Sequence, residues 1–194
     1  MPAKINASTS SGLVVDSDLT GSLQLQTGGN PAISIDSSQV TNFAKQFQIG
    51  GVLPPAFSAR PATSTQSVSN NTWTKVTLGT EEFDTNNNFA SSRFTPTVAG
   101  YYQLNAFLFC TNSGGSMTAI RCNIYKNGSD ALWGSFISPV SATDAIASVS
   151  GIVYLNGTTD YVELYGYIGG SSTSPVFAGA TNYTQFNGIM VRAA

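Results

Sequence analysis

The 194-residue sequence contains no histidine, only two cysteines, and charged residues that make up just 9% of the chain. A histidine base beside a serine or cysteine nucleophile is therefore excluded. The carboxylates are scattered at turn positions, where solvated turn residues are the simpler interpretation, although a glycosidase-like pair could still converge in space. Two cysteines without histidines do not complete a zinc site, and no dense Asp/Asn loop indicates calcium. We predict no catalytic residues, no metal and no cofactor.

Positive charge is equally scarce, with eight Lys and Arg residues and a net charge of −2. Nucleic-acid binding depends on clustered cations that neutralise phosphates, so we expect no nucleic-acid partner. No apolar run is long enough for a membrane helix, and the N-terminal residues MPAKINASTS lack the apolar region of a signal peptide. We therefore expect no membrane partner and folding in a cytoplasm.

The two cysteines, Cys110 and Cys122, fall on successive predicted strands. Free cysteine is usually a small buried hydrophobe, and a cytoplasmic protein rarely keeps a disulfide. We expect two buried free thiols. A disulfide would require a strand register that brings the two Cα atoms within about 7 Å.

From residue 56 onwards the sequence has the alternation and the turn residues of β-structure. Asn127-Gly128 predicts a tight hairpin, and a second Asn-Gly pair follows at Asn156-Gly157. No stretch has the pattern of a long helix. An all-β fold, an antiparallel sandwich or jelly roll, is the prediction. The expected strands are residues 56–60, 72–76, 101–110, 120–125, 131–138, 145–155, 161–168 and 183–192, with a loop at 63–71.

Residues 83–109 are the stretch around which the rest is organised. They lead through a proline turn into a long strand with apolar side chains on both faces, which predicts a core on one face and a partner on the other. Residues 161–168 carry a similar second aromatic face. Such side chains indicate either an intersubunit contact or an ordinary second-sheet core. The candidates for a subunit interface are Tyr101, Phe107, Phe109, Tyr161, Tyr165 and Tyr167.

Residues 1–50 differ from the rest, because short apolar pairs recur there about every ten residues between polar turns. Each strand is too short to bury its apolar face alone, so stacked repeats and an irregular hairpin are both possible. We expect an anchoring and trimerisation segment at 1–50, a linker at 51–55 and a globular head at 56–194. The candidate anchoring residues are Leu13, Val15, Leu23, Leu25, Ile33 and Ile35.

Six pieces of residues 56–193 resemble the complement C1q globular-domain family and occur in that family's order. The stretch 93–102, RFTPTVAGYY, is similar to the signature G-x-F-T-x-P-x-x-G-x-Y, with Arg93 where the family often has glycine. The resemblance implies the jelly-roll fold that this family shares with tumour necrosis factor, and a homotrimer around a closed apolar axis. The other pieces are residues 56–59, 83–89, 124–128, 155–162 and 186–190.

The N-terminal stretches 21–28, GSLQLQTG, and 32–36, AISID, resemble short repeats that precede such domains in tailed-bacteriophage virion proteins. The likeness implies a trimeric virion protein, assembled in the host cytoplasm, that decorates or cements the capsid or forms a head fibre. Its partner would be the major capsid protein or another virion protein. The alternative is a tail-fibre tip or receptor-binding module whose loops, 111–116 and 169–175, contact a host-surface glycan.

Overall fold

The computed structural model describes residues 23–27, 30–35, 38, 41–43, 54–62, 65–138, 142–171, 174–179 and 183–194. Every regular element in these ranges is a β-strand, and the paired strands are antiparallel. The chain divides into two compact units, Met1–Phe47 and Gln48–Ala194. We call the second unit the head.

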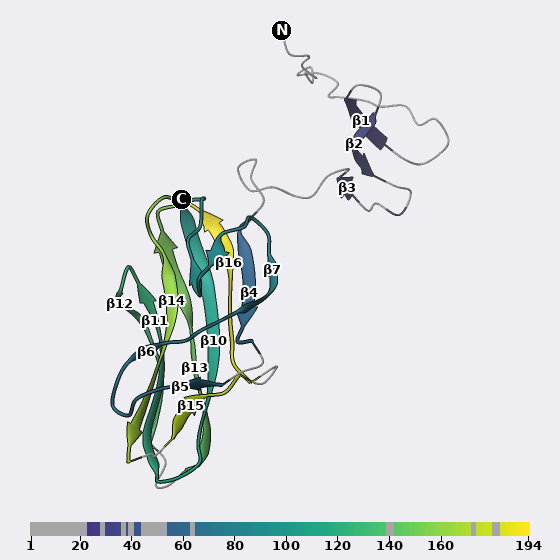
Figure 1. Cartoon of the computed structure of the whole chain (residues 1–194). Helices are drawn as coiled ribbons and strands as arrows, with labels where there is room; N and C mark the ends of the chain where they lie inside the picture. Colours follow the sequence, from purple (N-terminus) through teal and green to yellow (C-terminus); the bar gives the residue numbers. More distant parts are fainter. Residues whose placement is uncertain are drawn as a thin grey trace. The chain divides into compact units, whose positions relative to one another are not determined.

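The described part of the first unit is a small sheet in the order β1 (Leu23–Thr27), β2 (Asn30–Ile35), β3 (Thr41–Phe43) (Figure 1). Two of the predicted apolar pairs lie in paired strands, where Leu23 stands opposite Ile35 and Leu25 opposite Ile33. The described strands therefore form a meander. The first apolar pair, Leu13 and Val15, and residues 51–53 of the predicted linker lie outside the described residues.

The head is a sandwich of two sheets (Figure 1). The central strand of the larger sheet is β10 (Gly100–Asn112). One edge of β10 pairs with β13 (Asp144–Leu155), and the other is shared by β16 (Gln185–Ala193) and β15 (Pro175–Phe177). The sheet continues from β16 to β4 (Ala56–Arg60) and β7 (Thr80–Asp84), and from β15 to β5 (Gln66–Ser67).

The smaller sheet has the order β12 (Ser129–Ile137), β11 (Met117–Lys126), β14 (Val162–Gly170), β9 (Arg93–Phe94), β8 (Phe89–Ala90). The short strand β6 (Thr74–Lys75) also pairs with β14. This two-sheet arrangement confirms the predicted antiparallel jelly-roll sandwich.

The core lies between the sheets and is built from alternate residues of the strands. Along β10, Tyr102, Leu104 and Leu108 are fully buried, and the Tyr102 hydroxyl donates a 2.6 Å hydrogen bond to the Val98 carbonyl. In the facing sheet Gly166 leaves no room for a side chain, because a Cβ there would collide with Leu108 and Phe177. One predicted face of the central strand is thus confirmed as core.

Most predicted strands are found, with moved ends. The strand at 56–60 is confirmed at the predicted bounds, whereas 72–76 shortens to β6 and the predicted loop at 63–71 contains β5. Asn127 and Gly128 both have positive φ, 53° and 80°, as a two-residue hairpin between β11 and β12 requires. Residues 156–161 instead connect β13 to β14, which belong to different sheets.

The predicted buried free thiols are confirmed. Cys110 lies in β10 and Cys122 in β11, so the two residues belong to opposite sheets and face the shared core. Burial raises the pKa of both thiols, that of Cys122 to about 12. They act as small core residues in their neutral form.

Candidate functional site

The outer face of the larger sheet is the candidate site with the most unusual composition. The side chains of β10 that point away from the core begin with Tyr101. The register places a residue of β13 beside each of them and, as far as Phe107, a residue of β16 on the other side. Tyr101 lies opposite Tyr154, their ring centroids 5.5 Å apart, and the next row joins Ile152, Gln103 and Ile189. We call these three strands' outer surface the β10 face.

Large apolar side chains stay exposed on this face. Ile152 is 56% exposed and Ile189 50%, although both stand in the middle of well-formed strands. Large contiguous apolar patches are rare on soluble monomers, so this face is the candidate interaction surface. The other exposed apolar residues of the face are Tyr101, Ile146, Tyr154 and Val191.

A polar row crosses the middle of the β10 face. Asn105 lies opposite Ser150 on one side and Asn187 on the other. The Gln103 amide donates to the Asn105 Oδ1 and Ser150 Oγ atoms at 3.2 and 3.1 Å, and the Asn105 amide donates to Asn187 Oδ1 at 3.3 Å. Because these groups bond to one another, the row can be buried against a partner with less cost than unpaired amides would impose.

Beside the polar row lies an open cavity of about 470 Å³. Trp133 of the edge strand β12 lines it together with Phe107, Asn105 and Ser148. Trp133 is 71% exposed and belongs to the smaller sheet, so this edge of the sandwich adds a large aromatic side chain to the polar row of the β10 face. Exposed tryptophans of this kind often anchor protein interfaces.

The structure divides the six predicted interface residues between two surfaces. Tyr101, Phe107 and Phe109 share the β10 face, as the alternation along β10 requires. Tyr161 directly precedes β14, and Tyr165 and Tyr167 lie within that strand, on the outer side of the smaller sheet. One interface on the larger sheet would therefore include only the first three residues.

The outer side of the smaller sheet is covered largely by its own side chains. Tyr165 stacks on Tyr125 with ring centroids 4.0 Å apart, and the ring centroids of Trp73 and Tyr167 are 5.4 Å apart. The Arg93 guanidinium lies 3.8 Å from the centre of the Tyr161 ring. These tyrosines are half-buried within one protomer, so the monomer already accounts for much of their apolar area.

An ionic cluster around a buried carboxylate lies in the same region. The side chain of Glu163 is 4% exposed, and its Oε1 atom accepts hydrogen bonds from Lys75 Nζ at 2.7 Å and Arg93 Nε at 2.8 Å. Burial alone would raise the pKa of this carboxyl, but the hydrogen bonds and charges of Lys75 and Arg93 outweigh it and lower the pKa below its ordinary value. Glu163 is therefore a charged structural carboxylate.

The first predicted recognition loop, 111–116, lies beside the described residues 169–171 of the second. The Ser171 amide donates to the Ser116 carbonyl at 3.1 Å, and Met117 pairs with Gly170. Asn112 shapes the first loop, because its Oδ1 accepts a 2.9 Å hydrogen bond from the Gly114 amide. The structure therefore brings residues 169–171 beside the first loop, about 58 residues away in sequence, whereas residues 172 and 173 of the second loop lie outside the described residues.

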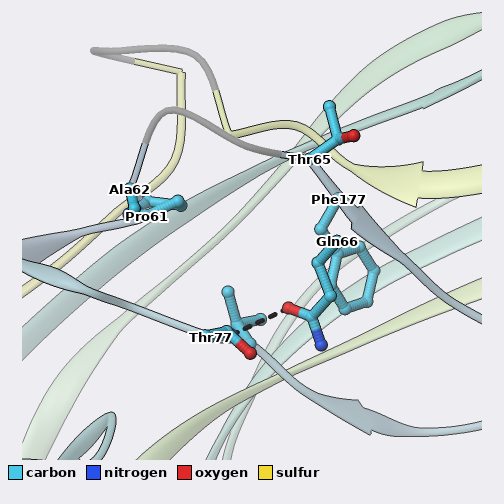
Figure 2. Close-up of a pocket in the computed structure, with 7 residues that line it drawn as sticks. Pro61, Ala62, Thr65, Gln66, Thr77 and Phe177 are labelled. Atoms are coloured by element: carbon cyan, nitrogen blue, oxygen red, sulfur yellow. Dashed lines mark hydrogen bonds between the residues drawn. The ribbon is translucent and has the colours of Figure 1, made fainter.

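A smaller cavity of about 220 Å³ lies beside β5 (Figure 2). Its lining includes Pro61, Ala62 and Phe177, and the Thr77 amide donates to Gln66 Oε1 at 2.8 Å. No charged side chain of the described residues lines it. This composition suits packing of the neighbouring loop better than chemistry on a substrate.

In the described part of the chain, no group of three or more His, Cys, Asp or Glu side chains is placed to hold a metal ion. Within those residues no helix has the length and apolar character needed to cross a membrane.

Solved structures share the architecture of the head. The globular domain of zebrafish complement 1qA protein is similar over 72% of this chain and 99% of its own, with 20% identity and a TM-score of 0.50. The head is a C1q- and TNF-like jelly roll. Murine APRIL, crystallised at pH 8.0, gives 9% identity and a TM-score of 0.54 over 71% of this chain and 99% of its own.

Eiger TNF from S. frugiperda is similar over 73% of this chain and 95% of its own, with 10% identity and a TM-score of 0.53. No family model matches the sequence, and no curated protein matches it. At these identities the likeness establishes the jelly-roll fold of the head and nothing about its ligands.

Several residues of the β10 face escaped the sequence analysis. Ile146, Ile152 and Tyr154 alternate with the buried Ala147 and Val153 along β13, so both faces of that strand are apolar. β10 has the same two-faced pattern, from which the sequence predicts a covered outer face. This pattern could have identified β13 as well, but the pairing of the two strands is a property of the fold.

Proposed function

We propose that the protein is a homotrimeric structural component of a tailed-bacteriophage virion, with a non-catalytic role as capsid decoration, cement or head fibre. The observation that carries the proposal is the β10 face, where exposed isoleucines and tyrosines surround a self-bonded polar row. A second and third copy of the chain would bury this apolar area.

The chemistry of the β10 face supports self-association over attachment to a charged partner. Its apolar rows contain Ile152, Ile189 and paired tyrosines, while Arg192 lies at the rim. Trp133 lies at the edge beside this face and not on it. The Trp133 edge of one copy could therefore contact the β10 face of the next, and the same contact repeated around an axis would close a ring. The resemblance to the C1q family implies that the ring has three members.

The first unit supports an anchoring role. Its described strands form only a small sheet, and such sheets need an apolar face covered by other elements to be stable. Strands from neighbouring subunits or from the major capsid protein could supply that cover. The resemblance of residues 21–36 to repeats of virion proteins also supports an anchoring role. The head would then project from the particle.

Sedimentation of the full chain tests the trimer. We expect the mass of three chains for the natural protein and of one chain for Ile152→Asp, because the new carboxylate would be buried without a partner. Phe136→Asp is the matched control, since Phe136 is similarly exposed at 57% but lies on the smaller sheet beside Arg121. A natural protein that sediments as one chain refutes the trimer.

Removal of residues 1–50 tests the anchor. The truncated protein should remain a trimer. It should no longer associate with the particle, as measured by co-sedimentation with virions. If the truncated protein associates with particles as well as the full chain does, the N-terminal unit is not the anchor.

A receptor- or glycan-binding role, such as that of a tail-fibre tip, is the second candidate. The observation favouring it is the Ser171–Ser116 hydrogen bond, which joins the loop 111–116 to the described start of the loop 169–175. Binding of the isolated head to host cells, abolished by substitutions at the exposed Ser113 and Ser171, would support this role.

A further inference from the structure

An open cavity of about 530 Å³, lined mostly by polar residues, lies beside β8 and β9 of the smaller sheet. The two charged side chains that line it, Lys75 and Arg93, are both positive. Glu163 contacts both and supplies one negative charge, so these three side chains together leave one positive charge. The Asp84 carboxylate of the adjoining turn does not line the cavity and accepts hydrogen bonds from the Asn86 and Phe89 amides. The cavity's other lining residues are Asn87, Asn88, Ala90, Ser91, Thr95 and Thr97.

Both cations are held in place before any ligand arrives. Lys75 Nζ donates to the Ser91 carbonyl at 2.9 Å as well as to Glu163. Arg93 is fixed between Glu163 and the ring of Tyr161, and it contacts the carboxylate through Nε. Among the described residues no hydrogen bond engages its two Nη atoms, which carry the paired donors that suit a carboxylate. Preorganised donors lower the entropic cost of binding.

The backbone around the cavity is also unusual. Asn87 and Ser91 line it with φ of 54° and 52°, and Ser92 in the same turn has φ of 59°. Positive φ is costly for residues other than glycine and tends to persist where the surrounding structure enforces it, often at binding sites. Here the turn presents the Ser91 carbonyl to Lys75, and Asn88 Oδ1 accepts from the Thr97 amide at 3.3 Å.

We propose that this cavity binds an acidic saccharide, a sugar whose ring carries a carboxylate. Arg93 holds the carboxylate through its Nη atoms, and Lys75 adds a second positive charge. The side chains of Asn87, Ser91 and Thr97 face the hydroxyl groups of the ring. The volume lies within the about 300–1,000 Å³ of small-molecule sites.

Neutral amides and hydroxyls favour a sugar acid over a bare inorganic anion, which would leave them unused. The site differs from the loop surface at 111–116 and from the β10 face, and it requires neither a trimer nor a virion. On the smaller-sheet side of the head it would stay accessible when the β10 face is covered.

Calorimetric titration of the full-length protein with methyl β-glucuronide tests the proposal. Methyl β-glucoside, which has a neutral CH₂OH group in place of the carboxylate, should bind at least about tenfold more weakly, as should inorganic phosphate. Raising the salt concentration should weaken the binding of the glucuronide and leave the binding of the glucoside unchanged. No measurable glucuronide binding overturns the proposal, and so does equal binding of the glucoside or of phosphate.

Arg93→Lys keeps the positive charge but removes the paired Nη donors, together with the Nε donor to Glu163, and about a tenfold loss of glucuronide affinity is expected. Arg60→Lys is the matched control, because Arg60 pairs with Glu82 outside the cavity. This variant should bind the glucuronide with unchanged affinity. Thr97→Val leaves the ionic cluster intact and should weaken binding several-fold even if Arg93→Lys fails to fold. Unaltered affinity in both cavity variants assigns the binding elsewhere and refutes the site.

Discussion

Replacing Glu163 by glutamine removes the charge at the centre of the ionic cluster while keeping the shape of the side chain. The carboxylate accepts charge-assisted hydrogen bonds from Lys75 and Arg93, and its own side chain is 4% exposed. Hydrogen bonds to charged groups contribute about 1.5–3 kcal/mol each. Breaking a fully buried pair costs about 3–5 kcal/mol, but the side chains of Lys75 and Arg93 are 31% and 42% exposed and can be solvated. We expect Glu163→Gln to lower the free energy of unfolding by about 2 kcal/mol at pH 7.

The loss should depend on pH in a defined direction. The folded-state pKa of Glu163 lies below its unfolded value of about 4.3. The carboxylate therefore contributes its full stability above the unfolded pKa, and that contribution disappears as the pH falls through the folded-state pKa. The natural protein and Glu163→Gln should differ at pH 7 and converge in strongly acidic buffer.

Chemical denaturation at one fixed protein concentration measures both effects, because association would otherwise add to the apparent stability. Glu82→Gln is the control: this carboxylate pairs with Arg60 at the surface, side chain 47% exposed, and its loss should change stability by less than about 1 kcal/mol. The reasoning is refuted if Glu163→Gln matches Glu82→Gln at pH 7, or if its deficit is the same at every pH.

Three further expectations concern the head. Gly166→Ala should lower the free energy of unfolding by about 1–3 kcal/mol, since its Cβ has no room in the core; an unchanged denaturation midpoint would contradict this. Cys110 and Cys122 should not react with a thiol reagent until the protein unfolds, because both are buried with raised pKa values; rapid labelling of native protein would count against it. Asp160→Asn should destabilise the head by about 1–2 kcal/mol at pH 7, as Lys126 holds this carboxylate with a lowered pKa; calorimetry showing equal melting temperatures would exclude that role.

Local patterns were sufficient for the strands and for much of the core. The period of two along residues 101–110 assigned Tyr102, Leu104 and Leu108 to one face, and those side chains are fully buried. The Asn127-Gly128 turn was predictable because few residues besides asparagine and glycine tolerate positive φ. Short strands such as β8 and β9 were missed as separate elements, because two residues cannot display a period.

The division of the aromatic residues could not be read from the chain. Tyr101 and Tyr165 both lie on the outward side of an apolar strand, and alternation treats them alike. The fold places β10 in one sheet and β14 in the other, so the two residues face opposite sides of the sandwich. Tyr165 then stacks on Tyr125 within the protomer, while Tyr101 stays 43% exposed.

By itself, then, the sequence determined the β-class of the head, the inward residues of its long strands, its tight hairpin and the burial of its thiols, since each depends on neighbours close in the chain. Only the tertiary structure decided which outward residues share a surface. It also assembled the ionic cluster, whose carboxylate lies 88 residues from Lys75 and 70 from Arg93. Strand pairing joins distant segments, and local periodicity carries no information about which partner a strand will choose.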